Sequence, residues 1–434
     1  MRDFARSENA KVQAQLDRLA RLSVPDGRLG LETIRALLDR LGNPHRKLPP
    51  VFHVAGTNGK GSTCAFLHAM LEAEGYKVHV TTSPHLVRYN ERIRVAGELI
   101  SDDRLAELLA EVLDAGEDLN PSFFEVTIAA AFTEFARVSA DACVVEVGLG
   151  GRFDATNVLE PEALAACGIA ALGIDHERFL LAPEEGVPEE PIARIAFEKA
   201  GIAKRGVQLV TLPEDTYPAE AYNALADAAC AAGAILNDTN QWVYFNKNDA
   251  TLLDDFVGET ALRPSLVGSH QLANVALAAT MLLVQDRIAI SAEAIVAGAS
   301  SVEWPARMQR LGSGPLTASA AYREIWLDGG HNPSAGLAIA EALTGPLHLI
   351  LGMLDNKDPH SLLVALGDQV RTLTAVPIPG HSAHPVEVFG SDARKAANVE
   401  DALIALPADG LPVLIAGSLY LAGEVLRLND ELPD

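Results

Sequence analysis

The feature that most constrains this chain is a glycine-rich segment, residues 56–63 (Gly-Thr-Asn-Gly-Lys-Gly-Ser-Thr), which directly follows the apolar run 51–55. The pattern predicts a strand that enters a tight turn and then a helix. Glycines let several backbone N–H groups point into one concavity, and the following helix adds its positive N-terminal end. Lys60 supplies a positive charge suited to a β- or γ-phosphate, and Ser62 or Thr63 is placed to face a phosphate-bound Mg²⁺. The segment therefore predicts a binding site for nucleotide phosphates.

The simpler alternative is a glycine turn that only connects a strand to a helix, and the flanking strand and helix patterns favour the phosphate site. The spacing within the turn narrows the class of protein. Only Thr57 and Asn58 separate Gly56 from the pair Gly59-Lys60, whereas the common P-loop has four residues at this point. The shorter turn resembles that of the Mur ligase superfamily rather than that of GTPases or transport ATPases.

Length and composition further limit the class of protein to which the chain can belong. A chain of 434 residues exceeds one compact core, so we expect two domains. Hydrophobic residues make up 49% and charged residues 21%, which excludes wholesale disorder. The net charge of −24 argues against a general nucleic-acid or anionic-membrane surface. The four cysteines, at positions 64, 143, 167 and 230, show no C-x-x-C spacing and predict buried free thiols in a reducing compartment.

The first six residues lack the apolar region of a secretory signal, and no apolar run is long enough to span a membrane. We therefore expect a cytoplasmic protein that binds small molecules, with no nucleic-acid or membrane partner.

Strand-like and helix-like patterns alternate along the first 300 residues. Helical periodicity over residues 8–42, broken at Pro25-Asp26-Gly27, predicts two helices before the first strand. The expected strands are 51–55, 78–82, 142–147, 165–174 and 206–212, with 88–95 as a hairpin arm, and the expected helices are 105–113, 124–138 and 192–203. This alternation predicts a doubly wound, mostly parallel sheet in an ATP-binding α/β domain that covers residues 1–301.

The pattern restarts near residue 300 and predicts a smaller, Rossmann-like α/β domain over residues 302–434. Its expected strands are 325–328, 347–351, 372–376 and 413–416, and its expected helices are 334–343, 362–366 and 419–428.

Polar side chains recur where the expected strands of the parallel sheet end. Ser83 follows the second strand, Glu146 closes an apolar strand, and Asp175-His176 follow the next one. Ligands of open α/β sheets bind beyond the carboxyl ends of the strands. Taken singly, Glu146 is equally a buried ion-pair partner, His176 a loop histidine and Ser83 a turn residue. Their shared edge beside the phosphate site favours a Mg²⁺ site instead.

Lys199 is unusual because it lies in a mostly apolar helical segment that ends in glycine. One interpretation is an exposed lysine paired with a carboxylate. The other is a site lysine modified by CO₂, whose carbamate would bind metal as a carboxylate does.

These residues lie in blocks that resemble folylpolyglutamate synthases and dihydrofolate synthases over nearly the whole chain. The blocks keep their order, which makes the resemblance specific. They are residues 56–63, 82–86, 90–93, 123–125, 146–157, 198–202, 270–274, 304–307 and 328–333.

The resemblance implies roles for individual residues. Those implied to bind ATP are Gly56, Thr57, Asn58, Gly59, Lys60, Gly61, Ser62, Asn274, Arg307 and Asp328. Those implied to bind two Mg²⁺ ions are Ser83, Glu146, His176 and Lys199, the last as a carbamate, and K⁺ is a further candidate ion. Those implied to contact the pterin substrate or the glutamate are Thr82, Arg88, Phe123, Phe124, Glu125, Arg152, Phe153, Asp154 and Ser418, with His331 as a candidate base near the glutamate.

The chain departs from the family pattern at two points. Residues 183–191 make the link between His176 and Lys199 longer than is usual in the family, and Gly330 stands where alanine is more usual. The similarity also rests on fewer blocks in the second domain.

The implied activity is ATP-dependent ligation of L-glutamate to dihydropteroate and to folates through an acyl phosphate, by a monomeric enzyme. Folate polyglutamylation alone is the nearest alternative. A Mur ligase of another substrate would need an N-terminal UDP-binding domain, for which about 50 residues before the first strand are too few. A P-loop switch or transport ATPase and a non-catalytic binding protein are the alternatives from other classes.

Overall fold

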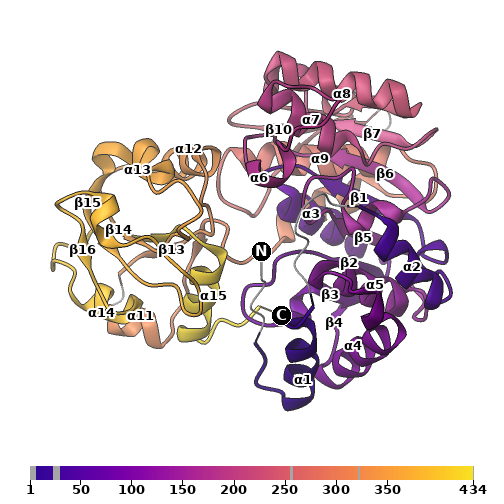
Figure 1. Cartoon of the computed structure of the whole chain (residues 1–434). Coiled ribbons are helices and arrows are strands. Elements are labelled where there is room, and N and C mark those ends of the chain that lie inside the picture. The colour runs from indigo at the N-terminus through magenta and orange to yellow at the C-terminus, as the bar shows by residue number, and fades with distance from the viewer. Residues whose placement is uncertain (1–5, 23–29, 255–257, 321–322, 434) are drawn as a thin grey trace. The chain divides into compact units, whose positions relative to one another are not determined.

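The computed structural model describes residues 6–22, 30–254, 258–320 and 323–433. These residues form two compact units (Figure 1). The larger unit contains the described residues up to His85, those from Tyr89 to Ser265 and those from Gln271 to Val302. The smaller unit contains Leu86–Arg88, Leu266–His270 and the residues from Glu303 onward. The expected boundary between residues 301 and 302 separates two folding domains, which are not the same as these compact units. That boundary stays a prediction.

An eight-stranded sheet forms the centre of the larger unit, with the strand order β4-β3-β2-β5-β1-β6-β7-β8. Six of its strands are parallel, while β3 and β4 pair antiparallel at one edge. The strands are β1 (Val51–Ala55), β2 (Val78–Thr81), β3 (Ile93–Val95), β4 (Glu98–Leu99), β5 (Ala142–Glu146), β6 (Leu164–Ile169), β7 (Gln208–Thr211) and β8 (Ile235–Asp238). The chain leaves β1 toward β2 on one side and later toward β6 on the other. Such a reversal opens a crevice beyond the carboxyl ends of the central strands.

Ten α-helices accompany this sheet within the described residues (Figure 1). They are α1 (Ala10–Leu19), α2 (Glu32–Arg40), α3 (Lys60–Ala73), α4 (Asp102–Gly116), α5 (Phe123–Phe135), α6 (Glu177–Leu180), α7 (Pro191–Ala200), α8 (Ala219–Ala232), α9 (His270–Leu283) and α10 (Ala292–Ser301). A small antiparallel sheet of β9 (Val243–Phe245), β10 (Ala250–Asp254) and β11 (Gly258–Leu262) completes the unit.

The smaller unit has its own six-stranded sheet, with the order β12-β13-β17-β14-β15-β16, in which only β12 is antiparallel. Its strands are β12 (Gln309–Arg310), β13 (Ile325–Leu327), β14 (Leu347–Leu351), β15 (Val370–Ala375), β16 (Arg394–Lys395) and β17 (Val413–Ala416). Its helices are α11 (Pro315–Ser319), α12 (Pro333–Ala342), α13 (Ser361–Leu366), α14 (Val399–Ile404) and α15 (Leu419–Leu428). The predicted fold class is thus confirmed: a doubly wound, mostly parallel sheet and a second, smaller α/β sheet.

Three local expectations were wrong. The strand expected over residues 165–174 ends at Ile169, because the next residues leave the sheet to bond the glycine-rich turn. Residues 89–92 of the expected hairpin arm form a 3₁₀ turn, and the hairpin is made by β3 and β4 alone. Cys230 is exposed rather than buried, because it lies on the outer side of the alanine-rich helix α8; the other three cysteines are buried, and all four are free thiols.

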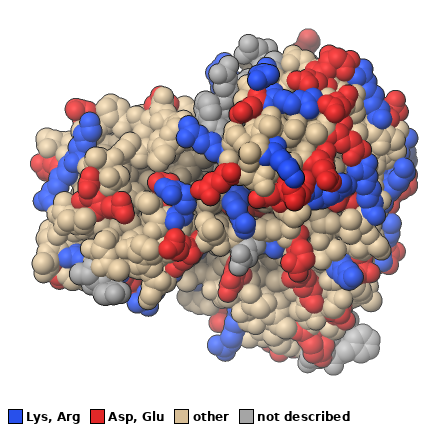
Figure 2. Space-filling model, turned by 90° about the horizontal axis from the view of Figure 1, so that it is seen from below, with Lys and Arg blue, Asp and Glu red and all other residues tan. Residues whose placement is uncertain are grey.

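The helix break expected at residues 25–27 lies outside the described residues. No helix among those described is long and apolar enough to cross a bilayer. On the face shown in Figure 2, acidic and basic side chains are interspersed.

Helix α10 packs on α3 through a backbone contact at Gly298, where an added Cβ would collide with the main chain of Met70. Backbone atoms cannot rotate away as a flexible side chain can. We therefore predict that Gly298→Ala lowers the free energy of unfolding by about 1–3 kcal/mol, although alanine is the better helix former.

Urea denaturation followed by circular dichroism measures this change. Ser300→Ala on the exposed side of the same helix is the control, expected to stay within about 0.5 kcal/mol of the wild type. A Gly298→Ala protein as stable as the control would contradict the close packing of α10 on α3.

Candidate active site

The predicted phosphate site is a turn between β1 and α3. Gly56 and Gly59 have φ angles of 152° and 84°, a region that favours glycine, and Gly59 directly precedes the helix. Gly59 has no side chain to cap the helix, so the first N–H groups of α3 are left to bind an anion. The Lys60 amine lies 3.4 Å from the carbonyl oxygen of Thr57, within the same turn.

The segment after β6 holds this turn in place. The amides of Thr57 and Asn58 both donate to the carbonyl of Ala171, at 2.8 and 3.1 Å. The Thr57 hydroxyl donates to the carbonyl of Gly173 at 2.8 Å and accepts from its amide at 3.0 Å. Residues 171 and 173 make these bonds instead of extending β6, and His176 follows three residues later in the chain.

Lys199 lies on α7 with its side chain buried against the turn. Its amine donates to the carbonyl of Gly56 at 2.9 Å, and the residue is 4% exposed. Burial, followed by repulsion from Lys60, lowers the pKa of Lys199 to about 7. The expectation of a lysine at the site rather than on the surface thus agrees with its position, while its role stays a prediction.

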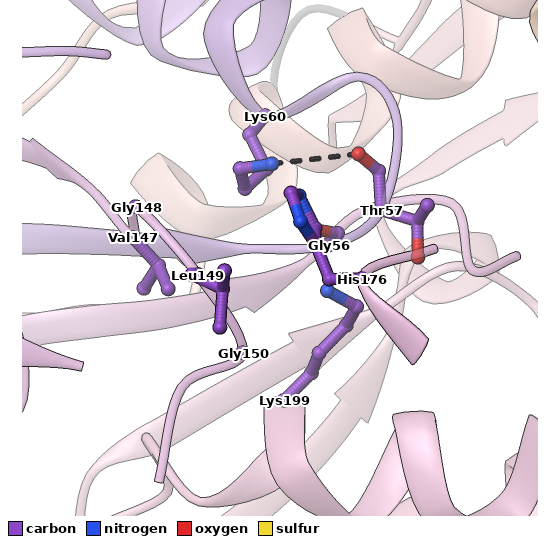
Figure 3. Close-up of a pocket in the computed structure, with 9 residues that line it drawn as sticks. All are labelled: Gly56, Thr57, Lys60, Val147, Gly148, Leu149, Gly150, His176 and Lys199. Carbon is purple, nitrogen blue, oxygen red and sulfur yellow. Dashed lines mark hydrogen bonds between the residues drawn. The ribbon is translucent and has the colours of Figure 1, made fainter. Parts of the chain in front are cut away.

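A small cavity joins these parts. It is lined by Gly56, Thr57, Lys60, Val147, Gly148, Leu149, Gly150, His176 and Lys199. Figure 3 shows Lys60, His176 and Lys199 converging near Gly56 from three different segments. His176 has a φ of 53°, and its amide donates to the carboxylate of Asp175 at 2.7 Å.

Two of the expected metal ligands meet at the end of β5. The carboxylate of Glu146, which is buried, accepts a hydrogen bond from the Ser83 amide at 2.9 Å. Among the residues that the structure describes, no group of three or more His, Cys, Asp or Glu could hold a metal ion. The expected ligands Ser83, Glu146 and His176 include only two residues of these four types, so they do not make up such a group. They fit Mg²⁺, which takes few protein ligands and completes its shell with phosphate oxygens and water.

Asn274 on α9 lies directly beside the turn. A Cβ on Gly59 would collide with its side-chain oxygen, and its amide nitrogen donates to Gln271 at 2.9 Å. This places Asn274 next to the residues expected to bind phosphate, although residue 274 is far from them in sequence.

The expected pterin-side residues around Phe123 divide into two groups. A Cβ on Gly148 would lie 2.5 Å from the ring of Phe124, so this ring packs on the cavity wall. Phe123 packs edge-on against Tyr89, with centroids 5.5 Å apart. The carboxylate of Glu125 accepts from the Ser122 amide at 2.7 Å in a capping box, which gives this side chain a structural role at the start of α5.

The loop after β5 is tied down by a buried polar chain. Asp154 accepts hydrogen bonds from the amides of Leu149 at 2.9 Å and Thr156 at 3.0 Å, and burial raises the pKa of its carboxyl group. The Thr156 hydroxyl also donates to Asp154 and pairs with His53 on β1 at 2.8 Å. Burial lowers the pKa of His53 to about 3, so its imidazole is neutral. Asp154 is thus bonded within the loop that lines the cavity.

Arg152 is enclosed by carboxylates and aromatic rings. Its guanidinium bonds Glu184 at 2.6 Å and Glu198 at 2.7 Å, and lies 4.3 Å from the centroid of the Phe153 ring. The expectation that Arg152 and Phe153 contact substrate stays a prediction, and the structure adds two acidic partners that the motif did not indicate.

Four of the expected residues cluster within the smaller unit. The Asp328 carboxylate accepts from the amides of Met308 at 2.8 Å and Gly330 at 2.7 Å. A Cβ on Gly329 would lie 3.0 Å from the Arg307 guanidinium, and the His331 ring lies 3.3 Å from the Gly329 carbonyl. Ser418 caps α15 by accepting from the Tyr420 amide at 3.1 Å.

Thr82 and Arg88 lie near one another in sequence but belong to different units. The amide of Thr82 donates to the carbonyl of Arg92 at 3.3 Å in the larger unit. Arg88 belongs to the smaller unit, where its guanidinium donates to the carbonyl of Pro433 at 2.9 Å.

Sequence reasoning missed three contributors to this site: His53, Glu184 and Glu198. A histidine within an apolar strand is a signal that could have pointed to His53, because a buried polar side chain needs a partner. The two glutamates carry no local signal, since their importance comes from Arg152, which is more than 30 residues away in sequence.

No protein-family model matches the chain. Curated relatives do match over most of its length. The dihydrofolate synthetase of Saccharomyces cerevisiae is 32% identical over 431 residues, which cover 93% of this chain and 98% of the yeast protein. The dihydrofolate synthase/folylpolyglutamate synthase of Escherichia coli is 32% identical over 418 residues, or 93% of this chain and 92% of that protein.

Solved structures agree with these relatives. The structure of E. coli FolC in complex with DHPP and ADP matches with a TM-score of 0.80 and 30% identity, covering 96% of this chain and 97% of that one. A bifunctional folylpolyglutamate synthase/dihydrofolate synthase with Mn, AMPPNP and L-glutamate bound matches with a TM-score of 0.79, 30% identity and the same coverage.

The lowered pKa of Lys199 predicts a pH dependence of stability. The folded amine is neutral above about pH 7, whereas the unfolded amine keeps its ordinary value of 10.5 and stays protonated. The unfolded state therefore binds more protons between these values, so the contribution of Lys199 favours the folded state increasingly as pH rises from about 7 to 10.5. One unit of pKa shift corresponds to about 1.4 kcal/mol.

Unfolding of the wild type and of Lys199→Met from pH 6 to pH 10, in buffers free of CO₂, measures this effect. The stability of the wild type relative to the variant should increase with pH. Lys77→Met, which removes an exposed lysine, controls for the general loss of a positive charge. A difference between wild type and Lys199→Met that does not change with pH would show that the amine is not buried as described.

Proposed function

The chain belongs to the folylpolyglutamate synthase/dihydrofolate synthase family, and we propose that it uses ATP to ligate L-glutamate to dihydropteroate and to folates. The observation that carries the proposal is the glycine turn with its buried lysine. Lys199 donates to the carbonyl of Gly56 inside a cavity that also contains Lys60 and His176. A turn of this kind binds phosphates, and a buried lysine is not needed for that purpose alone.

A free carboxylate is a poor acyl donor, because oxide would have to leave. Transfer of the γ-phosphoryl group of ATP to the carboxylate gives an acyl phosphate. The amine of L-glutamate then attacks the acyl carbon, the new C–N bond forms, the C–O bond to phosphate breaks, and the amine loses a proton. Lys60 offsets negative charge on the phosphates, with the N-terminal end of α3 beside it. We propose His331, in the smaller unit, as the base that takes the proton.

Divalent metal belongs to this proposal. Ser83, Glu146 and His176 would hold Mg²⁺, and Lys199 as a carbamate would hold a second ion; K⁺ is a further candidate. Bound Mg²⁺ would neutralise charge on the phosphoryl group that is transferred. The chain contributes a neutral Lys199 amine near pH 7, which is the form that attacks CO₂: the N–C bond forms and a proton is released.

We propose that the remaining expected residues bind the substrates. Gly56, Thr57, Asn58, Gly59, Gly61, Ser62 and Asn274 would bind ATP together with Arg307 and Asp328. Thr82, Arg88, Phe123, Phe124, Arg152, Phe153 and Asp154 would lie along the pterin substrate and Ser418 near the glutamate. The capping role of Glu125 makes it an indirect contributor that fixes the two neighbouring phenylalanines.

We further propose a monomeric, cytoplasmic enzyme without nucleic-acid or membrane partners. Polyglutamylation of folates alone remains the nearest alternative, because the residues of the pterin side do not separate one activity from two.

The proposed function predicts glutamate-dependent release of ADP. Purified protein with ATP, Mg²⁺ and L-glutamate should turn over with dihydropteroate and with tetrahydrofolate, and mass spectrometry should find one added glutamate in each product. Omission of glutamate is the control. Turnover with only one acceptor would assign the chain to that single activity, and no turnover with either would overturn the proposal.

Carbamylation of Lys199 predicts a chemical signature that does not depend on turnover. In ¹³C-labelled bicarbonate, the wild type should show a carbamate carbonyl signal by NMR that Lys199→Ala lacks. Turnover of this variant should fall about 100-fold, because about 2.7 kcal/mol of charge stabilisation is lost. Near-normal turnover, or a signal that persists in the variant, would exclude the carbamate role.

A further inference from the structure

The long link between α6 and α7 contains a glutamate that bonds Arg152, a residue of the loop after β5. Residues 181–190 form neither helix nor strand. Glu185, Glu189 and Glu190 are exposed, but the Glu184 side chain is only 20% exposed. Its surroundings therefore differ from those of the acidic residues beside it.

Glu184 bonds two arginines. Its carboxylate accepts from both terminal nitrogens of Arg152, at 3.1 and 2.6 Å, which is the paired geometry that orients a guanidinium. It also accepts from Arg194 on α7 at 3.0 Å. Glu198, one turn further along α7, bonds the same arginines, Arg152 at 2.7 Å and Arg194 at 2.9 Å.

The four side chains form a group with two positive and two negative charges. The side chains of Arg194 and Glu198 are each 6% exposed, so solvent screens these charges only weakly. Removing one carboxylate from such a group leaves two guanidiniums to share the other, so one largely buried positive charge is no longer balanced, which is costly. Of these four residues, only Glu184 lies in the link between α6 and α7. Its negative charge makes the numbers of positive and negative charges in the group equal.

This group connects the loop after β5 to the helix that carries Lys199. The amide of Arg152 donates to the carbonyl of Glu198 at 2.8 Å. A Cβ on Gly151 would lie 2.7 Å from the carbonyl oxygen of Lys199, so the two backbones touch. Gly150 and Lys199 both line the cavity. A shift of Arg152 would therefore move the cavity wall and Lys199 relative to each other.

We propose that Glu184 is a positioning residue: through Arg152 and Arg194 it holds the loop of residues 148–154 against α7 and so fixes the place of Lys199 in the cavity. The inference rests on the proposed function for its kinetic consequence. Glu184 is not among the residues that line the cavity, so the role proposed for it runs through its arginine partners.

A competing interpretation gives Glu184 the opposite effect. If Arg152 binds a substrate carboxylate, Glu184 occupies its guanidinium and competes with the substrate. Removal of the Glu184 charge would then lower the KM for the folate substrate. Under the positioning role, removal lowers kcat and leaves the KM for ATP within about a factor of two.

The test compares Glu184→Gln, which keeps the shape and removes the charge, with Glu185→Gln, which removes a neighbouring exposed charge. Steady-state kinetics give kcat and KM for ATP and for the folate substrate. Hydrogen exchange followed by mass spectrometry reports the backbone amides of residues 148–154 independently of activity. Glu184→Asp restores the charge on a shorter side chain.

We expect kcat to fall about tenfold in Glu184→Gln, with partial recovery in Glu184→Asp and no change in Glu185→Gln. The amides of residues 148–154 should exchange at least threefold faster in Glu184→Gln alone. Unchanged kinetics and exchange, or a lower KM for the folate substrate, would overturn the inference while the proposed function stands. Absence of glutamate-dependent turnover in the wild type would instead overturn the proposed function, and the exchange comparison would still decide whether Glu184 holds the loop.

Discussion

The hydrogen bond from the Lys199 amine to the Gly56 carbonyl is the interaction on which the rest of this site depends. It joins α7 to the end of β1, which are 143 residues apart in sequence. A buried amine loses its hydration, so it must either find acceptors or give up its proton, and here the pKa falls to about 7. With a pKa of about 7, the Lys199 amine changes its charge near neutral pH. The same property suits it to react with CO₂.

Close backbone packing makes that interaction possible. Gly151 lies against the carbonyls of Glu198 and Lys199, and an added Cβ on Gly201 would collide with Arg152. Neither position has room for a side chain, so the loop after β5 and the end of α7 meet main chain to main chain. The glycines act here through the absence of Cβ rather than through unusual φ angles. A side chain at either position would separate the cavity wall from the lysine.

Charge balance around Arg152 adds a second constraint. A guanidinium between two carboxylates and two aromatic rings is held in one orientation, and Arg194 shares both carboxylates. The net charge of −24 means that basic side chains are outnumbered by acidic ones in this chain. Two arginines take part in joining α7, the link before it and the loop after β5.

Local patterns in the sequence determined much of this protein. The strand-turn-helix at residues 51–73, the alternation of both sheets and the strand-end position of Ser83 and Glu146 follow from periodicity and turn chemistry, which depend on near neighbours in the chain. The early end of β6 did not follow, because Ala171 and Gly173 bond a turn more than 100 residues away rather than a neighbouring strand. The capping role of Glu125 was readable as Ser-x-x-Glu, yet the family resemblance assigned it to substrate. Only the tertiary structure decided that Glu184 and Glu198 surround Arg152, that His53 supports Asp154 through Thr156, and that Lys199 is buried. The physical reason is that the pairing, burial and pKa of a side chain depend on which distant segments pack against it. The residues next to it in sequence do not indicate which segments those are.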